Sequence, residues 1–590
     1  MGENNQLIKK SVLHMTPACF MITLAANITL MADTLLAGFL IDQTAIAAVA
    51  VASPVINIFR ALIMTIISGV IVKITISLGR GERKEINCSY SMGVIGVAVA
   101  GILFAVIGFV FARQLSVILG GGDNAKVVEL AVIYIQACAG TLLFSCINTY
   151  FGKILSIYGY QKEVFVNALI SIVANIILSA TIVQLLPEKY AIAGLGYGTC
   201  LAGLICSTVS YTTMKRKKLP VKFTKFRFSL KEFKEILKHG FPTSANNLAD
   251  GVVSGIVNKI ILAAFSGSAT ALSVYTVVKS ICTFAQSATN GVALATAPLF
   301  GILYGARDKN GIKRTLREGY KIGLFVTVGG CIALFLLLPI LQQFYGMPGD
   351  MNIRKGVFIC FLFMPVILAV RLMTQFFEST EKAGMGILYS IAPDSVIYPI
   401  ILLPLIASLG YTGIWLAYGL NFVIFLVLLF ILRSVKIRSF TFSVDRLLCL
   451  DENIRDNVPV LDISIQSDNK TAAGVSDKVH DFLCAEGLSE KIAYKTALCL
   501  EEITSDFVAH TLSEPGESIA KEIMDIKLFS DPDRMRIIIR NAAKPYNPLD
   551  FDYSDTTFNK IGVKMVQKIS KNIDYSYAYK MNIITLDLDK

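Results

Sequence analysis

The chain has few charged residues and none of the cysteine patterns that hold disulfides or zinc. Only 17% of its 590 residues are charged, and it contains a single tryptophan. The twelve cysteines stand alone, with no Cys-x-x-Cys pair, and nine of them lie before residue 440. This dispersal excludes a disulfide framework and a cysteine zinc site, and it is typical of small apolar thiols within helices. Its basic residues are better explained by membrane topology than by a nucleic-acid site, so we expect no nucleic-acid partner.

Apolar residues are abundant as far as about residue 440 and ordinary in number beyond it. They make up 54% of the chain, and its mean hydropathy is +0.61. Residues 1–440 contain 37 Lys+Arg and 18 Asp+Glu, whereas residues 441–590 contain 18 and 25. The overall excess of basic residues therefore describes only the first part. We expect one polypeptide that joins a basic membrane region to an acidic water-soluble domain.

Twelve apolar segments predict an all-α membrane region, because each is long enough to supply the roughly 20 apolar residues that a span needs. The segments are 15–40, 46–77, 89–112, 127–156, 164–186, 191–213, 240–265, 270–304, 319–344, 354–377, 384–408 and 411–433. The connections richest in Lys and Arg follow even-numbered segments, at 80–84, 215–238 and 307–321. Basic loops mark the cytoplasmic side. The pattern predicts a multi-pass protein of a bacterial cytoplasmic membrane with both termini in the cytoplasm.

The two sets of six segments resemble each other. Pro17 and Asp33 are sixteen residues apart, as are Pro242 and Asn258 in the second set. The loop at 79–83, rich in Gly and Arg, has a counterpart 226 residues later. Six-span repeats of one topology predict two lobes related by an axis normal to the membrane, with a central site between them.

Several ionisable or polar residues fall within the apolar segments. A charge at the centre of a membrane costs about 2.5–3.5 kcal/mol or more, so each one needs a reason. Asp33, Asp250 and Asp394 are candidates to bind a cation or carry a proton, and the alternative for each is a structural acid bonded to a neighbouring helix. Arg371 and Lys259 are their candidate ion-pair partners.

Residues 15–435 resemble the multidrug and toxic-compound extrusion (MATE) transporters. The matching stretches are 32–34 with Gly38, 79–82, 194–199 and 240–242. The resemblance implies a V-shaped, two-lobed exporter that works by alternating access. Such an exporter exchanges H⁺ or Na⁺ for amphiphilic, often cationic, small molecules.

The resemblance transfers functional residues only in part. Asp33 falls where proton-linked members carry an acid in the first span, which they pair with a fifth-span acid four residues after an Asn. Here Asn175 is present, but the later position is Ser179. Asp250 falls where sodium-linked members carry a seventh-span acid, which makes it a candidate Na⁺ ligand. Asn258, the repeat counterpart of Asp33, is a further candidate, and the coupling ion stays open between H⁺ and Na⁺.

The soluble part is predicted to be an α/β sandwich. Apolar spacing indicates strands at 458–465, 523–529, 536–540 and 581–588, and helices at 472–486, 489–512 and 562–572. Glu502 and Asp506 are four residues apart, so both carboxylates lie on one helix face. They could activate water and hold Mg²⁺, and a solvated acidic face is the plainer alternative.

Three stretches of this part resemble the N, first-glycine and second-glycine boxes of the gyrase/histidine-kinase ATPase fold, and anti-sigma-factor serine kinases most of all. By position, the resemblance assigns Glu502 to catalysis and Asp506 to Mg²⁺. It assigns Asn541 to adenine, and Ala543 and Gly562 to the phosphate loops, where Ala543 replaces a glycine. Mg-ATP is thus a candidate cofactor, and ATPase or kinase activity stays open.

We therefore expect six parts in the chain: an N-terminal cytoplasmic segment (1–14), an N-lobe (15–214), a basic inter-lobe loop (215–239), a C-lobe (240–434), a linker (435–456) and an ATPase-like domain (457–590). The function they favour is an ion-coupled exporter with a cytoplasmic regulatory domain, which a cytoplasmic protein partner could also engage. Two alternatives remain: a lipid-linked saccharide flippase, and a membrane-tethered kinase-like regulator with the membrane half as its sensor.

Overall fold

The computed structural model describes most of the chain. The described residues are 6–41, 43–117, 125–224, 229–265, 269–344, 347–437, 447–448, 450, 460–466, 469–513, 523–531, 533–550 and 558–590. Most of the predicted linker lies outside them. All twelve predicted apolar segments are helical over nearly all of their described residues, and α1 begins at Gln6, within the segment expected to precede the first span.

The N-lobe is a bundle of helices from the first part of the chain. Its elements are α1 (Gln6–Leu40), α2 (Gln43–Arg80), α3 (Arg83–Val110), α4 (Ala112–Ser116), α5 (Ala125–Ile157), α6 (Gln161–Leu185), η3 (Glu188–Tyr190) and α7 (Ala191–Arg216). Helices α5, α6 and α7 pack along one another, and α2 and α3 pack on α5.

The C-lobe follows, and its elements repeat the same general plan. They are α8 (Leu230–Ala264), α9 (Ala269–Gly305), α10 (Lys309–Leu336), α11 (Leu338–Phe344), α12 (Met351–Leu362), α13 (Met364–Glu378), α14 (Ala383–Ile391), η4 (Ala392–Ile397), α15 (Tyr398–Leu409) and α16 (Tyr411–Ile437). Helix α9 packs on α10 and α13, and α16 packs on α12 and α15.

Nine helices within the described ranges are long and apolar enough to cross a membrane, and a bent pair makes a tenth. The pair is α12 and α13, which meet at an angle of 49°. Pro365 explains the bend, because it stands in the first turn of α13 and has no N–H for the helix ladder. Helices α8 and α9, with 35 and 37 residues, pack against these spans but are not among the ten. The twelve-span count therefore stays a prediction.

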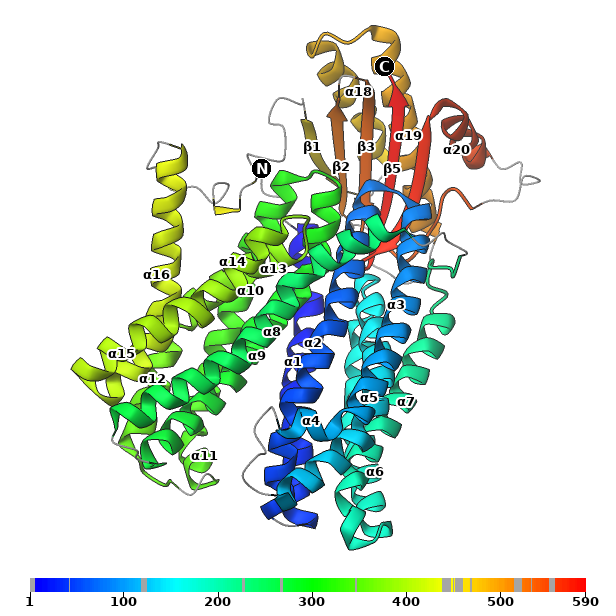
Figure 1. The fold of residues 1–590 in the computed structure, drawn as a ribbon. Helices are drawn as coiled ribbons and strands as arrows, with labels where there is room; N and C mark the ends of the chain where they lie inside the picture. The colour runs from blue at the N-terminus through cyan, green and yellow to red at the C-terminus, as the bar shows by residue number, and fades with distance from the viewer. Residues whose placement is uncertain are drawn as a thin grey trace.

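The two lobes meet through glycines at the end of the bundle on which the C-terminal β-sheet stands. Their ribbons diverge toward the other end (Figure 1). A Cβ added to Gly79 of α2 would lie 2.0 Å from the Ile302 carbonyl oxygen, and one on Gly305 of α9 would lie 2.1 Å from that of Ile76. These two contacts are reciprocal and are separated by the 226-residue repeat offset. Only glycine permits backbones to approach so closely.

A second close contact joins α2 to α8. A Cβ on Gly240 would lie 1.7 Å from the Thr65 carbonyl oxygen, and one on Gly69 would lie 1.9 Å from that of Ile236. The hydroxyls of Thr65 and Ser244 are hydrogen-bonded at 2.6 Å in the same interface. The lobes therefore share a tightly fitted contact at the sheet end.

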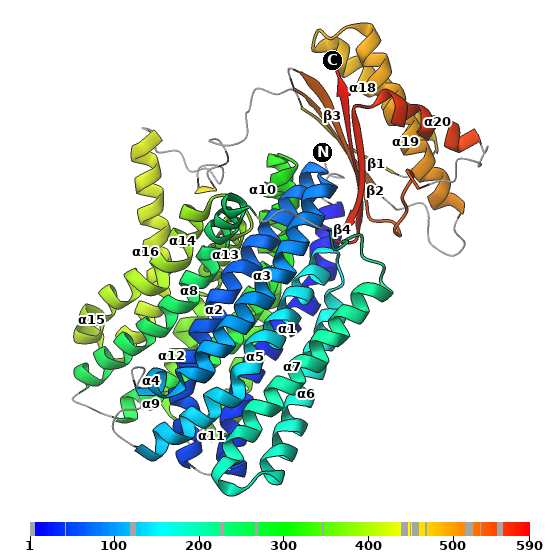
Figure 2. The ribbon, with the colours of Figure 1, turned by 45° about the vertical axis from the view of Figure 1, so that its right-hand side comes forward.

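The C-terminal domain is a five-stranded sheet with helices on one face, standing on the end of the bundle (Figures 1 and 2). Its elements are β1 (Val460–Gln466), α18 (Asn469–Ala485), α19 (Glu490–Ser513), β2 (Ile523–Ser530), β3 (Arg534–Asn541), α20 (Phe558–Ile569), β4 (Asn572–Ala578) and β5 (Met581–Asp589). The strand order is β1-β2-β3-β5-β4, and each neighbouring pair is antiparallel. The α/β sandwich stays a prediction for this domain.

Strands β4 and β5 form a β-hairpin whose turn points toward the bundle. The sequence did not predict this hairpin. The expected helix at 562–572 ends at Ile569, and β4 begins at Asn572. Strands β4 and β5 pair in a register that leaves Tyr579 and Lys580 as the two turn residues. Buried residues of this hairpin belong to the core of the membrane bundle, whereas the other face of the sheet packs with its own helices.

The glycine contact generates a first prediction. Gly240→Ala should destabilise the protein by about 1–3 kcal/mol, because the new methyl group overlaps the Thr65 carbonyl and the lobes must move apart. The measurement is the thermal unfolding midpoint of the purified protein in detergent.

Gly255→Ala is the matched control, since Gly255 lies on the same helix with no atom within 4 Å of an added Cβ. It should be neutral or stabilising, because alanine favours a helix by up to about 1 kcal/mol. Equal midpoints for the two variants would contradict the interlobe contact.

Candidate functional site

An ion pair lies inside the C-lobe, between two segments in which the sequence predicts charged candidates. Arg371 of α13 and Asp394 of η4 are paired, with Nη2 and Oδ2 at 2.8 Å. Asn421 of α16 donates to the Pro393 carbonyl at 3.1 Å and to Asp394 Oδ1 at 3.5 Å. Segment η4 is π-helical, and such segments often occur at functional sites because they reposition side chains.

Asp250 of α8, whose side chain is exposed, joins this pair electrostatically together with Lys279 of α9, which was not a candidate from the sequence. Asp250 interacts electrostatically with Asp394, Arg371 and Lys279. Lys279 of α9 donates to the Ser254 hydroxyl at 3.0 Å. Lys259, the basic residue expected beside the acids, is exposed instead. We call Asp250, Asp394, Arg371 and Lys279 the C-lobe charge cluster.

The C-lobe charge cluster is balanced, with two acidic and two basic side chains. Among the described residues, Arg371 Nε is a buried donor with no hydrogen-bond partner, as is the nearby Ser395 hydroxyl. A buried donor without a partner costs about 1–3 kcal/mol, which a water bound beside the ion pair would relieve. Chemically, the cluster can exchange one cation for another at a carboxylate while its bases hold the remaining charge.

The N-lobe candidates are not brought into a comparable cluster by the described side chains. Asp33 lies in α1, but its side chain is outside the described part of the structure. Asn175 donates to the Thr199 hydroxyl at 2.7 Å, which ties α6 to α7. Ser179 packs against Gly198 of α7. Asn258 is half-buried in α8. Asn175 therefore contributes to helix packing here.

A small polar cavity lies between the lobes, below the sheet. Its volume is about 160 Å³, and it is lined by Lys153 of α5 and Glu378 of α13 together with hydroxyl groups of both lobes. Glu378 accepts a hydrogen bond from Ser390 at 2.9 Å. Neither charge is a candidate from the sequence, because Lys153 and Glu378 stand near the ends of their segments. The cavity nevertheless places opposite charges on opposite lobes.

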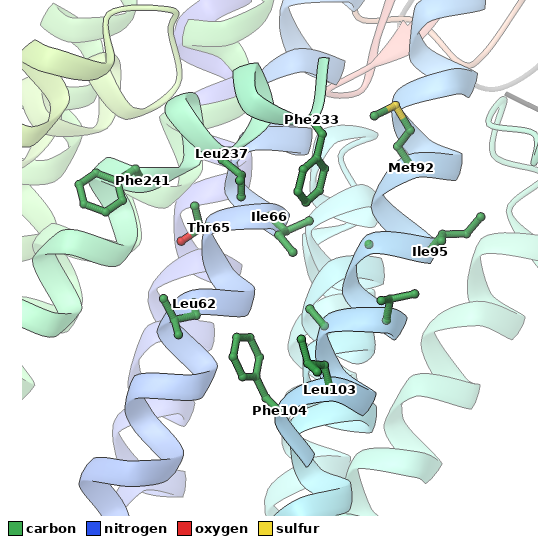
Figure 3. A pocket seen from close by; sticks show the side chains of 13 residues that line it. Leu62, Thr65, Ile66, Met92, Ile95, Leu103, Phe104, Phe233, Leu237 and Phe241 are labelled. Carbon is green, nitrogen blue, oxygen red and sulfur yellow. The ribbon is translucent and has the colours of Figure 1, made fainter. Parts of the chain in front are cut away.

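A larger cavity, about 780 Å³, lies between α2, α3 and the start of α8 (Figure 3). Leu62, Ile66, Phe104, Phe233 and Leu237 are among the side chains that face it. Its polar side chain, that of Thr65, is bonded to Ser244. This cavity has apolar walls and offers no group to hold an ion.

The C-terminal residues assigned to Mg-ATP by resemblance have protein partners. Asp506 accepts a hydrogen bond from the Tyr546 hydroxyl at 2.7 Å, and the Tyr546 ring stacks on His510 with centroids 3.7 Å apart. Asn541 is buried, and its Oδ1 accepts from Asn582 Nδ2 at 2.7 Å. The atoms expected to hold Mg²⁺ and adenine are thus already engaged.

The second-glycine region is also filled by protein. Helix α20 begins at Phe558, so Gly562 lies inside the helix and not at its N-terminus. A Cβ on Gly562 would lie 1.6 Å from Glu502 Oε2, which shows that the carboxylate rests directly on the helix backbone. The Ala543 carbonyl accepts a bond from Asn582 at 3.3 Å. These residues, as arranged, do not fit Mg-ATP, and nucleotide binding stays a prediction.

A buried charge cluster joins the C-terminal domain to the C-lobe. Asp308, which is 2% exposed, precedes α10 and accepts from the Gly311 N–H at 2.6 Å. Its carboxylate pairs with Lys527 of β2 and with Arg540 of β3, the latter at 2.7 Å. Burial alone would raise the pKa of Asp308, but the two basic groups outweigh it and hold that pKa well below its usual range.

The N-lobe contacts the same domain through residues 79–83, the counterpart of the C-lobe loop that contains Asp308. Arg83 pairs with Asp574 of β4 at 2.5 Å and donates to the Tyr575 carbonyl. A Cβ on Gly81 would lie 3.3 Å from Thr585 of β5. The two loops that repeat at a 226-residue offset thus both dock on one sheet.

The cluster of Asp308, Lys527 and Arg540 generates a second prediction. Asp308→Asn should destabilise the docked domain by about 3–5 kcal/mol, because it leaves two buried basic groups without their acid. Thermal unfolding, together with the rate of tryptic cleavage in β2 and β3, measures this loss.

The matched control for Asp308→Asn is Glu381→Gln. Glu381 is also paired, with Arg80 at 2.8 Å, but both side chains are about 40% exposed. An exposed pair contributes about 0–1 kcal/mol, so this variant should resemble the native protein. Equal losses in the two variants would contradict the buried cluster.

Asp525 generates a third prediction, concerning pH. Burial raises the pKa of Asp525 from its ordinary value of 3.8 to about 6. The native state therefore binds this proton more tightly than the unfolded state does, and stability falls as the pH rises from about 4 through 6. Asp525→Asn should gain on the order of 2–3 kcal/mol over the native protein at pH 8 and little at pH 4.

Calorimetric unfolding of the full chain at the two pH values measures this difference, and the exposed Asp481→Asn is the control. A gain that is the same at both pH values would show that Asp525 does not titrate in this range.

Comparison with known proteins identifies the membrane half. A family model described as MatE matches residues 17–181 and 251–397. A curated relative, the uncharacterized transporter YisQ of Bacillus subtilis strain 168, is 24% identical over 287 residues. That alignment covers 47% of this chain and 60% of the relative, so the chain spans less than two thirds of the relative's length.

Solved structures share the fold at low identity. One is a MATE protein in complex with MaD3S, with a TM-score of 0.67 and 18% identity, covering 77% of this chain and all of that one. Another is a MOP superfamily transporter from Pyrococcus furiosus, with a TM-score of 0.65 and 16% identity, covering 75% and 100%. A third is an outward-facing multidrug resistance MATE transporter, with a TM-score of 0.64 and 17% identity, covering 74% and 98%. From the family match, which spans more than half of its residues, the chain belongs to the MatE family.

Proposed function

We propose that this protein is a secondary active exporter, which moves amphiphilic, cationic small molecules out of a bacterial cell in exchange for H⁺ or Na⁺. The observation that carries the proposal is the C-lobe charge cluster, set within a MatE-family fold. An acid in a membrane helix is retained for a function when it faces the bundle interior and has a charged partner. Asp394 meets this condition through Arg371, and Asp250, whose side chain is exposed, interacts electrostatically with the same groups.

The exchange would follow from competition at the carboxylates. Asp250 and Asp394 can hold a cationic substrate or the coupling ion, and Arg371 and Lys279 balance the charge of the two carboxylates when neither is bound. Release of one cation on arrival of the other is what antiport requires. Asp33 and Asn175 are proposed as the N-lobe contribution, following the resemblance of the first and fifth spans.

Alternating access is supported by the arrangement of the lobes. They fit together through glycines at the sheet end, and their ribbons diverge at the other end (Figure 1). We assign the sheet end to the cytoplasm because the basic loops and both ends of the described chain lie there. The arrangement then corresponds to an outward-facing state with both termini in the cytoplasm.

The C-terminal domain is proposed as a regulatory module of this exporter. Its support is the contact with equivalent loops of both lobes, which is buried at Asp308. A nucleotide or a cytoplasmic protein is a candidate signal for it, and the tethered-regulator alternative would need such a signal as well. Calorimetry of the full chain with Mg-ATP decides the nucleotide question.

A second candidate activity is movement of a substrate with an anionic group, such as a lipid-linked saccharide. The observation in its favour is the number of basic residues inside the bundle, since Lys279 and Lys153 accompany Arg371. An anionic dye transported in preference to a cationic one would favour this candidate.

The export proposal generates the fourth prediction. In proteoliposomes with an imposed H⁺ or Na⁺ gradient, the native protein should transport a cationic dye. Asp250→Asn and Asp394→Asn should each lower the rate at least about tenfold, which corresponds to a loss of roughly 1.4 kcal/mol at the ion site.

Asp481→Asn, an exposed change in α18, should keep the native rate. A rate that is independent of both gradients would contradict coupling, and full activity in both acid variants would remove the cluster from the mechanism.

A further inference from the structure

The turn of the β4–β5 hairpin lies between the two lobes of the membrane bundle. Tyr579, at the first turn position, is completely buried. Its N–H donates to the Ile157 carbonyl at the end of α5, at 2.8 Å. Its hydroxyl donates to the Ala295 carbonyl of α9. One residue of the C-terminal domain thus bonds both lobes, through its backbone N–H to α5 and through its hydroxyl to α9.

The turn is held in a conformation that its residues disfavour. Tyr579 and Lys580 have φ angles of +55° and +56°. Two-residue hairpin turns of this kind favour Asn-Gly or Asp-Gly, and bulky residues at positive φ are uncommon. Such strain persists only where surrounding contacts determine it, and it is found mostly at functional sites. The contacts here come from the membrane bundle.

The bundle is shaped to receive this turn. Gly159, between α5 and α6, has a φ of +85°, and a Cβ there would lie 2.7 Å from Lys580 Cγ. The Lys580 ammonium reaches His14 of α1, with Nζ and Nε2 at 2.8 Å. Glycine at position 159 thus supplies both the turn and the space for the hairpin.

The turn also lies against the polar cavity between the lobes. Ile157, which accepts the Tyr579 N–H, lines that cavity, as do Leu294 and Ala297 on either side of Ala295. The cavity contains Lys153 from one lobe and Glu378 from the other. Any opening of the bundle at the sheet end must separate these two residues, and must also break one of the two bonds of Tyr579.

We propose that the β4–β5 hairpin is a lock that holds the lobes together at the sheet end, and that it must withdraw before the bundle opens there. Arg83 of the N-lobe pairs with Asp574 of β4, and Asp308 of the C-lobe holds β2 and β3, the latter being the strand that pairs with β5. The contacts that form the lock do not depend on the proposed function. Their consequence, control of access to the transport pathway, rests on the proposed function.

The test is hydrogen–deuterium exchange of the full chain in nanodiscs, comparing the native protein with Tyr579→Ala, Tyr579→Phe and Tyr494→Ala. Tyr494→Ala is the matched control, because Tyr494 is 64% exposed on α19 of the same domain. Exchange reports local opening directly. The peptides to follow cover 65–80 of α2 and 236–244 of α8, which form the interlobe contact.

Tyr579→Ala should raise exchange in these peptides at least about fivefold, Tyr579→Phe by a smaller factor, and Tyr494→Ala not at all. Peptides covering 524–528 of β2 should stay protected, which shows that the domain remains folded. If Tyr579→Ala unfolds the domain, Tyr579→Phe decides, since it keeps the ring and removes one bond. Native exchange at the interlobe peptides in the folded variants would overturn the lock.

Dye transport by the same variants separates this inference from the proposed function. Faster transport in Tyr579→Ala than in the native protein supports both. Absence of transport in every form, with raised exchange in Tyr579→Ala, overturns the proposed function and leaves the lock supported. Native rates together with native exchange overturn the lock and leave the function supported.

Discussion

The close approach of α2 to α8 and α9 is the contact on which the rest of the structure depends. Glycines on these helices bring backbone to backbone, and the reciprocal pair formed by Gly79 and Gly305 relates the lobes by the repeat offset. This contact sets the distance between the two equivalent loops that follow α2 and α9. Since those loops carry the sheet, the C-terminal domain can dock on both only while the lobes remain together.

The ion pairs between the bundle and the C-terminal domain do not all have the polarity that the difference in net charge predicts. A basic membrane region and an acidic domain would be expected to attract each other over a distance, and two pairs follow that sense, Arg83 with Asp574 and Arg314 with Asp462. The most buried contact has the opposite sense, because Asp308 comes from the basic region and Lys527 and Arg540 from the acidic domain. Reversed polarity at one point fixes the orientation of the domain, since a rotated domain would place like charges together.

Much of the fold could be predicted from the sequence, because hydrophobic runs and repeat offsets are local signals. The helices of both lobes coincide with apolar segments, and Asp250, Asp394 and Arg371 were singled out because charges in such segments are rare. Lys279 was missed although it is a charge within the apolar segment 270–304, the same signal that singled out Arg371, and only its position beside α8 depends on the fold. The hairpin was missed because Tyr579 and Lys580 carry no turn signal, and their conformation depends on contacts with distant helices. The nucleotide boxes were predicted from resemblance alone, and the bonds of Asp506 and Asn541 depend on partners far along the chain.

The C-lobe charge cluster and the polar cavity between the lobes both include residues of α13. This arrangement suggests how an ion in the cluster can be linked to the contact between the lobes. In the C-lobe charge cluster, a cation that takes Asp394 must displace Arg371, whose Nε already lacks a partner. A buried guanidinium without its acid costs several kcal/mol, so α13 or η4 has to shift to give it a new partner. Helix α13 ends at Glu378, in the cavity beneath the hairpin. A movement of α13 that relieves Arg371 would therefore also move Glu378 relative to Lys153, on the other lobe. In the proposed mechanism, one helix thus connects the C-lobe charge cluster to the contact on which the hairpin acts, and this connection needs no path through the C-terminal domain.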